Sequence, residues 1–599
     1  MRTWIAAAAF VLASLATSDG RAEPCDPVPI WRDGRRAGEV CRAEAGARGL
    51  TVIDLGDDWL PAVLAPGAGG GGPSYAETYR ALAEERFAEA GSDGDLAAQD
   101  RYLELYGIEP TFGVVRARLA DEARHRCHEV IDDSALLATE GRIGEESRAQ
   151  GIARIAHARA LRAQLEHARE RAKLEDFEAL ADGDRHLRRR LDRLIALETY
   201  LTAVRAAQGH LACDALFASP PVDAAYTSQT SDAIARFQRG AMILPSGALD
   251  DQTRDALALG SREREFRTAL RVLRARVIDA TGLVEDGTAG AGEGRVLGRP
   301  LEPEATWRVR GHEPLEDAAP DLISAATDAA ARALGWRDPG SALAFLNDLP
   351  APQIAVALPP APAYHTATMA LVAEIDRGDV WYDASPQWRD AERRPALIMY
   401  AIDGARRIAL TRWPTTIGGW QDQKVGDRVE TIWKESPVGP QVWRDLYVGP
   451  RWLPPNTTPD RELVRAGDHG VVLAREQFGP SYRAAFGFVA FLHLVEDRAH
   501  GEAIYVDQGI RTHGTGSVAT VARGASHGCH RLLGMNVVRL AGFVLKHHDH
   551  VRRGDQPTYY RRVVQYHGQF PLAIDTLGYR IELIGPIPVE VLPGRIHRP

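Results

Sequence analysis

The pattern of the sequence changes from helical to strand-like at Leu397-Ile398-Met399-Tyr400-Ala401-Ile402-Asp403-Gly404-Ala405-Arg406-Arg407-Ile408-Ala409-Leu410. Two short apolar runs flank an Asp-Gly pair, which is a strong short-range signal for a β-hairpin. Short apolar strands continue to Val591, so we expect a β-rich domain in roughly the last third of the protein. The sequence before this domain predicts mainly helices. The whole chain is therefore predicted to be a multidomain α+β protein.

Length and composition limit the class of protein. A chain of 599 residues is too long for one hydrophobic core, so three or four domains are expected. Hydrophobic residues make up 45% and charged residues 26%, a balance that excludes collagen, wholesale disorder and a multi-span membrane protein. The net charge of -9 offers no global basic field, so we expect no nucleic-acid partner.

The first 22 residues have the three parts of a secretory signal. Arg2 supplies a positive charge, Trp4 to Ala16 is an apolar run, and Gly20-Arg21-Ala22 places small residues where a signal peptidase cleaves. The run is too short to span a bilayer, and no other segment of the sequence reaches that length. We therefore expect residues 1–22 to be removed and the mature chain, starting at Glu23, to be secreted into the periplasm or cell wall.

Export changes the interpretation of the five cysteines. In an oxidising compartment four of them can pair, and proximity favours Cys25 with Cys41 and Cys127 with Cys213. The sequence alone does not fix this connectivity. Cys529 is left over among histidines and glycines, and an unpaired thiol in that setting is a candidate nucleophile.

Composition divides the rest of the chain into segments. Residues 75–190 are rich in Ala, Leu, Glu and Arg, which predicts a helical region, and the Arg188 to Arg190 run is interpreted as a solvated face. The other predicted segments are a small β element at 23–65, in which the Asp33-Gly34 pair predicts a hairpin, a glycine-rich linker at 66–74, a second helical region at 259–349, a linker and lead-in at 350–394, and the β-rich domain with a C-terminal extension at 395–599.

Residues 191–258 carry a motif of their own. Phe237-Gln238 lies on a predicted helix, Gly247 permits a tight turn, and Asp250 or Asp251 can cap the following helix. The pattern resembles the small three-helix peptidoglycan-binding domain, whose last two helices carry a Phe-Gln pair and a Gly-x-Leu-Asp-x-x-Thr turn, here Gly247 to Thr253. The resemblance implies peptidoglycan as a ligand, although the apolar residues pack a core in either case.

Two later segments contain the groups that a nucleophilic cysteine requires, Ile510-Arg511-Thr512-His513-Gly514-Thr515 and Ala525-Ser526-His527-Gly528-Cys529-His530-Arg531. A free thiol has a pKa of about 8.5 and needs a base. His513, 16 positions before Cys529, can lie on a neighbouring strand. The carbonyl of Gly514 can hold the other ring nitrogen of His513, and N–H groups near Gly528 and Cys529 can stabilise an oxyanion.

These residues are similar to the active site of YkuD-type L,D-transpeptidases, whose signature joins a histidine to a Ser/Thr-His-Gly-Cys element at about this separation. Here that element is Ser526 to Cys529, with Arg531 after it. Upstream, Thr416 to Gly419 resembles the family's strand ending in glycine, and Ser436 to Gly439 resembles its Thr-Pro-x-Gly turn. Leu446 to Pro455 resembles a strand of the larger, YcbB-like members, which also carry a peptidoglycan-binding domain.

The resemblance implies an enzyme that acts on peptidoglycan stem peptides. Cys529 would attack the carbonyl of the third residue of a tetrapeptide stem, with His513 as its base, and expel the terminal D-alanine. The amine of a second stem or of a protein would then take the acyl group. The remaining site residues would form the oxyanion hole, orient the reacting groups or contact the substrate, namely Gly514, Ser526, His527, Gly528 and Arg531. No metal or organic cofactor is implied, and carbapenem-type compounds are the expected inhibitors.

Several alternatives stay open. With water as the acceptor, the same site would be an L,D-carboxypeptidase or a cross-link hydrolase, and a degenerate domain would leave a non-catalytic wall-binding scaffold. His530 stands where the family usually has a small aliphatic residue, and it either points into a strand interface or adds a cation beside the thiolate. His547-His548-Asp549-His550 looks like a metal tract, but histidines at a helix end are more often solvated or capping, so we expect no metal site.

Overall fold

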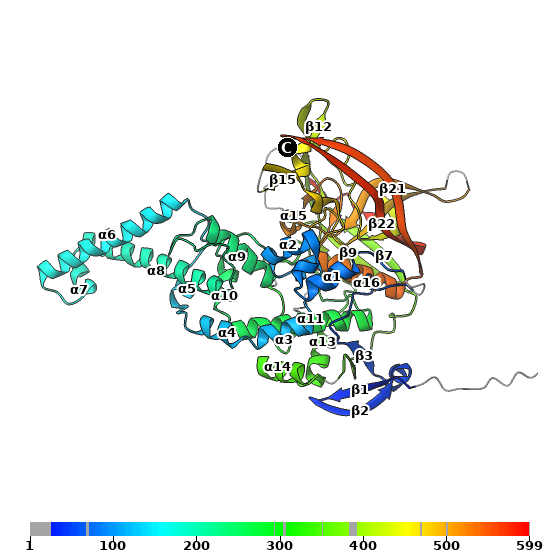
Figure 1. The fold of residues 1–599 in the computed structure, drawn as a ribbon, viewed down its shortest axis with the longest axis horizontal. Coiled ribbons are helices and arrows are strands. Elements are labelled where there is room, and N and C mark those ends of the chain that lie inside the picture. Colours follow the sequence, from blue (N-terminus) through cyan, green and yellow to red (C-terminus); the bar gives the residue numbers. More distant parts are fainter. Residues whose placement is uncertain are drawn as a thin grey trace, which may run out of the picture.

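The computed structural model describes residues 25–67, 71–290, 292, 294–303, 307–349, 351–382, 392–467, 470–498 and 501–597. The predicted signal at 1–22 lies outside these residues, as do Gly69 and Gly70 of the predicted linker. A β-rich domain, a helical centre and a small N-terminal sheet follow one another across the molecule, and a helical arm projects from the centre (Figure 1). Within the described residues, no helix combines the length and the apolar character that crossing a membrane requires.

The N-terminal sheet has four strands in the order β2-β1-β6-β3. They are β1 (Pro27–Arg32), β2 (Arg35–Cys41), β3 (Thr51–Asp54) and β6 (Gln353–Val356). Asp33 and Gly34 both have positive φ in the turn between β1 and β2, as the predicted two-residue hairpin requires. β6 corrects the linker predicted at 350–394, because Ile354 to Val356 are fully buried between β1 and β3. The prolines around this apolar run end a strand instead of marking a linker.

Helices fill both regions whose composition predicted them. In the first they are α1 (Ala76–Ala83), α2 (Gly91–Asp100), α3 (Phe112–Leu119), α4 (Glu122–Glu129), α5 (Ser134–Ala138), α6 (Arg148–Ala172), α7 (Phe177–Ala181) and α8 (Arg185–Cys213). In the second they are α11 (Ser261–Thr281), α13 (Leu322–Ala333) and α14 (Pro339–Asn347). α11 is almost completely buried along its length, and Phe266, Leu270 and Leu273 join the core shared with α3, α13 and α14. It is the central support of the helical part of the molecule.

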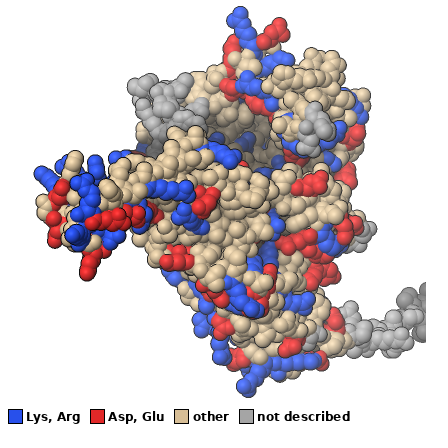
Figure 2. All heavy atoms as spheres, turned by 60° about the vertical axis from the view of Figure 1, so that its left-hand side comes forward, with Lys and Arg blue, Asp and Glu red and all other residues tan. Residues whose placement is uncertain are grey.

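The projecting arm consists of α6, α7 and the first half of α8 (Figure 1). Its small core contains Leu161, Leu165, Leu191 and Leu194. Basic and acidic side chains of both signs are interspersed over its surface (Figure 2). The run at Arg188 to Arg190 follows this pattern, since Arg188 pairs with Glu178 at 2.5 Å and the next two side chains are exposed. The prediction of a solvated face is confirmed.

The second half of α8 belongs to a different unit, completed by α9 (Ser228–Gly240) and α10 (Asp251–Ala258). The core of this unit includes Val204, Leu211, Ile234, Phe237 and Leu249, and it also takes in Leu136 and Ile143. A single 29-residue helix therefore serves both the arm and this three-helix unit, whose packing extends beyond residues 191–258.

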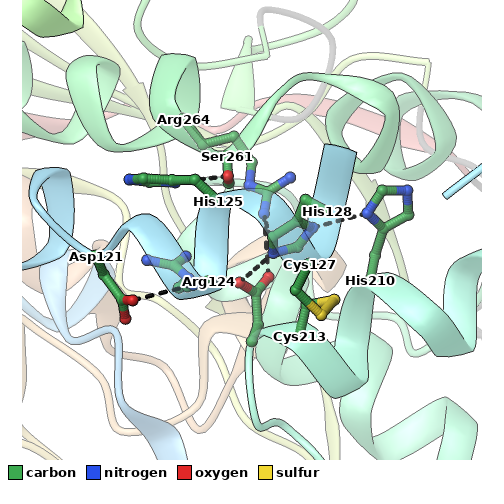
Figure 3. Close-up of a disulfide and its surroundings, with 10 residues drawn as sticks. Asp121, Arg124, His125, Cys127, His128, His210, Cys213, Ser261 and Arg264 are labelled. Atoms are coloured by element: carbon green, nitrogen blue, oxygen red, sulfur yellow. Dashed lines mark hydrogen bonds and ion pairs between the residues drawn. A yellow bond between two sulfur atoms is a disulfide. The ribbon is translucent and has the colours of Figure 1, made fainter. Parts of the chain in front are cut away.

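Two disulfides close loops in the N-terminal half, and both have the pairing expected from proximity. Cys25 bonds Cys41, and Cys127 bonds Cys213, which ties α4 to the end of α8 (Figure 3). Beside the second bond, buried Asp214 accepts hydrogen bonds from Arg124 and His128 at 2.8 Å and from Arg264 at 3.1 Å. This network attaches the three-helix unit to α4 and α11. Cys529 is free.

The β-rich domain is built on a nine-stranded sheet in the order β10-β9-β7-β22-β14-β17-β18-β20, with β21 paired to β22. The strands are β7 (Ala370–Asp376), β9 (Ala396–Asp403), β10 (Arg406–Pro414), β14 (Gly439–Val448), β17 (Val489–Asp497), β18 (Ile504–His513), β20 (His530–Arg531), β21 (His550–Gln565) and β22 (Gln569–Val591). Helix α16 (Gly534–His547) packs against it through Val537, Leu540 and Val544. β7 falls in the lead-in predicted at 350–394, so the sheet begins before residue 395.

The predicted hairpin that marks the change of fold class is formed by β9 and β10. Asp403 pairs with Arg406, so the turn residues are Gly404 and Ala405, one position later than the Asp-Gly pair predicts. Short strands and one helix complete the fold, namely β4 (Arg295–Val296), β5 (Arg299–Pro300), β8 (Asp379–Trp381), β11 (Ile417–Gly418), β12 (Trp420–Val425), β13 (Arg428–Trp433), β15 (Val464–Gly467), β16 (Gly470–Leu473), β19 (Ala525–Ser526), β23 (Arg595–His597) and α15 (Val518–Arg523).

Candidate active site

The strand register places His513 and Cys529 on the same face of the sheet. β18 and β20 are parallel, with Thr512 opposite His530 and His513 opposite Arg531. Because successive side chains alternate between faces, His513 and Arg531 share one face with Cys529, which lies two positions before Arg531. Cys529 directly precedes β20, so the turn that carries it lies at the end of the strand next to that of His513.

The turn that carries Cys529 is held from three sides by hydroxyl groups. The Ser526 hydroxyl lies 2.5 Å from the Cys529 carbonyl oxygen, and the Thr416 hydroxyl donates to the same oxygen at 2.8 Å. The Ser436 hydroxyl donates to the Gly528 carbonyl at 2.7 Å. Strand β11 pairs with β19 and places Thr416 beside this turn. Ser526 is therefore a positioning residue, buried and committed to the backbone.

Gly528 is required by its backbone conformation. Its φ is +106°, and a Cβ atom there would lie 2.7 Å from the Glu435 carbonyl oxygen. Its N–H donates to the Ser526 hydroxyl at 3.2 Å, which corrects the expectation that this N–H faces a substrate oxyanion. The N–H of Cys529 is left as the candidate oxyanion donor of the turn.

Burial shifts the pKa values of His513 and Cys529 in opposite directions. His513 is 1% exposed, and its burial lowers the pKa to about 3, with the cationic Arg531 adding to the effect. Nδ1 of His513 contacts the Gly514 carbonyl oxygen, the contact that the sequence analysis expects. A neutral ring that donates from Nδ1 presents Nε2 as an acceptor. Burial raises the pKa of the Cys529 thiol, and Arg511 and Arg531 oppose that rise only in part.

The two arginines beside the thiol, Arg511 and Arg531, differ in their ion-pair and hydrogen-bond partners. Arg511 forms an ion pair with Asp507 at 2.6 Å. The Arg531 guanidinium interacts with the thiol and with His513, and its buried Nε has no hydrogen-bond partner among the described residues. His527 is exposed at the edge of the turn, where Arg531 and Lys434 are its cationic neighbours. Arg531 therefore differs from Arg511 in having a buried donor with no partner among the described residues.

His530 points to the opposite face, into the strand interface. Its Nδ1 lies 3.2 Å from the Thr416 carbonyl oxygen, and its ring centroid is 5.0 Å from that of His493. Burial lowers the pKa of His530 to about 4, so the ring is neutral at pH 7. Of the two readings left open by the sequence, the interface is the one observed, and His530 adds no cation beside the thiolate.

A cavity of about 390 Å³ is lined by neighbours of Cys529 and His513, although neither of these two residues is part of its lining. Gly509, whose carbonyl oxygen lies 3.8 Å from Sγ of Cys529, is part of its lining, and so is Phe486, whose ring packs edge-on against His513 at 4.8 Å. Arg451 and Trp452 form part of the opposite wall. The cavity combines aromatic and apolar surface with a few charged groups, as small-molecule and peptide sites do.

The C-terminal hairpin β21–β22 holds that wall in place. The Tyr560 hydroxyl donates to the Pro454 carbonyl at 2.6 Å, and Arg562 donates to the Pro455 carbonyl at 2.8 Å while pairing with Asp460 at 2.5 Å. Trp452 packs against the small core under the hairpin. The predicted C-terminal extension thus contributes indirectly to the shape of the candidate site.

Sequence reasoning missed four residues around the site. Thr416 and Ser436 stand in segments that were singled out for their resemblance, but only the tertiary contacts show that their hydroxyls hold the Cys529 turn. Arg511 occupies the strand position two before His513, so strand alternation could have placed it on the same face. Phe486 has no local signal, because it reaches His513 from a separate loop.

The histidine run at the end of α16 is bound to backbone carbonyls. His547 lies 2.8 Å and 3.0 Å from the carbonyl oxygens of Thr366 and Gly282, and His548 lies 2.6 Å from that of Gly585. No group of three or more His, Cys, Asp or Glu arranged to hold a metal occurs among the described residues.

In the three-helix unit, the motif residues serve as internal supports. Gln238 is fully buried and donates to the Ala248 carbonyl and the Thr253 hydroxyl, each at 2.9 Å, while accepting from the Gly247 N–H. Asp250 caps α10 by accepting from the Thr253 N–H at 2.9 Å. The motif therefore fixes the loop between α9 and α10.

Residues 201–257 match the family model described as "Putative peptidoglycan binding domain". The match covers the second half of α8, α9 and α10, and it agrees with the resemblance seen from Phe237 to Thr253. It indicates a protein associated with the cell wall, with peptidoglycan as a partner. The comparison with curated proteins finds no match. The β-rich domain lies outside the matched residues.

Proposed function

We propose that this protein is an L,D-transpeptidase that acts on peptidoglycan stem peptides, with Cys529 as nucleophile and His513 as general base. The observation that supports this proposal is that His513 ends the strand paired with β20, the strand that Cys529 directly precedes, and that Gly509, whose carbonyl oxygen lies 3.8 Å from Sγ of Cys529, lines a cavity of about 390 Å³. The peptidoglycan-binding match in the same chain supports the class of substrate. Export to the periplasm or cell wall is part of the proposal.

The first half of the reaction forms a thioester. As Sγ attacks the carbonyl carbon of the third stem residue, its proton passes to Nε2 of His513 while Nδ1–H stays on the Gly514 carbonyl. Negative charge develops on the substrate oxygen, and the Cys529 N–H is the donor placed to stabilise it. The C–N bond then breaks, and the His513 imidazolium returns the proton to the departing D-alanine amine.

The second half transfers the acyl group. An amine from a second stem or a protein adds to the thioester carbonyl and gives its proton to His513, and the C–S bond breaks to restore the Cys529 thiol. The buried Nε of Arg531 has no hydrogen-bond partner in the part of the chain that the structure describes, and Arg531 is the group suited to hold the terminal carboxylate of the donor peptide.

The test is release of D-alanine from a purified disaccharide-tetrapeptide, with mass spectrometry of the products. Cys529→Ser should abolish release, and His513→Ala should slow it about 10²–10⁴-fold. Raising the pH should partly restore His513→Ala, because solvent can then generate thiolate, and should not restore Cys529→Ser. His186→Ala, exposed on α8, is the control. Full activity in His513→Ala would show that the base is a different group.

The same assay separates the acceptors. A cross-linked dimer identifies transpeptidation, whereas a free tripeptide alone identifies hydrolysis. Intact-mass analysis after exposure to a carbapenem should show one adduct on the wild-type chain and none on Cys529→Ser. A chain that forms no adduct and releases no D-alanine would be a wall-binding scaffold.

A further inference from the structure

A second cavity, of about 330 Å³, lies between α16, α11 and the turn at Glu104–Tyr106. Its lining shares no described residue with the cavity beside Cys529. Tyr79, Ile278, Met535 and Phe543 form part of its apolar wall. Its volume matches about ten water-sized groups, at roughly 30 Å³ each.

Two carboxyl groups enter this cavity with unused oxygen atoms. Glu104 is 2% exposed, and its Oε1 accepts from Arg271 at 2.9 Å, while its Oε2 is buried without a hydrogen-bond partner among the described residues. Oε2 of Glu109 is also buried without a hydrogen-bond partner among the described residues. Buried acceptors left unpaired are costly, and a native structure retains them where a ligand or water completes them.

Five basic side chains line the same cavity, namely Arg271, Arg274, Arg539, Lys546 and Arg552, and Arg274 and Arg539 have acidic partners other than Glu104 and Glu109. Arg274 donates to Glu302, and Arg539 has Asp286 as its ion-pair partner at 3.6 Å, beyond hydrogen-bond distance. Both cations act electrostatically on Glu109, together with Arg271, but none forms an ion pair with it among the described contacts. Apart from the bond between Arg271 and Glu104, none of the described contacts pairs these two carboxyl groups with Arg274 or Arg539.

We propose that this cavity binds a small zwitterion of dipeptide size, with its ammonium group on Glu104 and Glu109 and its carboxylate on Arg539 and Arg274. A simple anion would leave the two carboxyl oxygens unpaired, and a simple cation would leave Arg539 without a close partner. A zwitterion gives a partner both to the carboxyl oxygens and to the guanidinium groups. The apolar wall covers the carbon skeleton between its two charged ends.

The protonation of Glu109 gives the binding a measurable signature. Burial raises the pKa of Glu109 to about 8, and the neighbouring Glu104 adds to that rise, against Arg271, Arg274 and Arg539. Glu109 is therefore mostly protonated at pH 7 in the empty cavity. An ammonium group placed against it favours the carboxylate, so binding should release most of one proton per ligand.

The experiment is calorimetric titration of the Cys529→Ser chain at pH 7 with alanyl-alanine, in its L,L and D,D forms, in phosphate and in Tris buffer. At least one form should bind, with a buffer-dependent enthalpy that reports proton release. N-acetylated alanyl-alanine and alanyl-alanine amide each lack one charge, and both should bind about thirtyfold more weakly or not at all.

Variants locate the binding. Glu109→Gln should weaken binding about thirtyfold or more and remove the proton release, and its thermal midpoint at pH 7 should stay near that of the parent, since Glu109 is already neutral there. Arg539→Gln should weaken binding to a similar extent, and the exposed Glu316→Gln should not change it. The proposal is overturned if neither the L,L nor the D,D dipeptide binds. So does binding that Arg531→Gln removes and Glu109→Gln leaves intact, because the ligand would then sit beside Cys529.

Discussion

At the scale of single residues, burial raises the pKa of the Cys529 thiol and lowers that of the His513 imidazole, so both changes favour the neutral groups. We expect iodoacetamide to alkylate Cys529 slowly at pH 7 and increasingly fast as the pH rises above 9, with no plateau between pH 5 and 8. Arg531→Gln removes a cation that favours thiolate, so the rise should move to higher pH. Arg189→Gln, on the arm, should leave the profile unchanged. A plateau that begins near pH 6 would show a preformed thiolate–imidazolium pair instead.

His530 gives a second prediction at this scale, on stability. Its folded pKa of about 4 lies below the ordinary value of about 6.5, so the unfolded chain binds more protons as the pH falls from 6.5 towards 4. Stability is therefore lost in that window, by about 2 kcal/mol at pH 5 for this one ring. His530→Asn keeps a donor for the Thr416 carbonyl but cannot titrate.

Urea unfolding at pH 7 and pH 5 measures this effect. His530→Asn should lose less stability than the wild type between the two values, whereas His186→Asn, whose side chain is exposed, should behave like the wild type. An equal loss in wild type and His530→Asn would mean that His530 is already charged in the folded protein.

At the scale of elements, the hairpin β21–β22 supports one wall of the cavity beside Cys529 through Tyr560 and Arg562. We expect Arg562→Gln to raise KM for the tetrapeptide donor severalfold, because its ion pair with Asp460 and its bonds to backbone carbonyls are lost. Alkylation of Cys529 by iodoacetamide should not change, since the turn of Cys529 is held by other groups. Arg561→Gln, on the neighbouring position with a largely exposed partner in Asp575, is the matched control. Equal KM values in the two variants would exclude this role for the hairpin.

At the scale of the whole molecule, the arm and the three-helix unit share α8, and the bond between Cys127 and Cys213 closes a loop of 86 residues around their junction. The double variant Cys127→Ser/Cys213→Ser should lower the stability of the three-helix unit by about 2–4 kcal/mol. Hydrogen exchange should accelerate in residues 201–257 and stay unchanged in β17 and β18. Cys25→Ser/Cys41→Ser should affect only the N-terminal sheet. Unchanged exchange in residues 201–257 would show that the polar network around Asp214 suffices.

The same connectivity determines how peptidoglycan binding is tested. Excising residues 191–257 would remove most of α8, take away the partner of Cys127 and expose Leu136 and Ile143, so loss of binding would be hard to separate from misfolding. Sedimentation with sacculi is therefore best measured on the intact Cys529→Ser chain.

The state of the cysteines can be checked separately. On unfolded, non-reduced protein, thiol counting should find one free group, at Cys529.

The sequence by itself determined the features that depend on local pattern. Asp33-Gly34 predicts its hairpin, the capping role of Asp250 follows from its place before α10, and the 16-residue spacing of His513 and Cys529 fits two adjacent strands. Order along the chain favoured both disulfide pairs, and the 16-residue separation of Cys25 and Cys41 makes a loop that closes at low entropic cost, whereas the 86-residue separation of Cys127 and Cys213 gives no such preference.

Only the tertiary structure decided which groups meet across long separations. β6 enters a sheet with strands some 300 residues earlier, so its pairing has no local signal and the flanking prolines favoured a linker. His530 faces the interior because strand alternation and burial beside His493 place it there, and Gly528 loses its free N–H to Ser526. The Thr416 and Ser436 hydroxyls reach the Cys529 turn across about a hundred residues. Such contacts depend on how elements pack, which no single segment of sequence specifies.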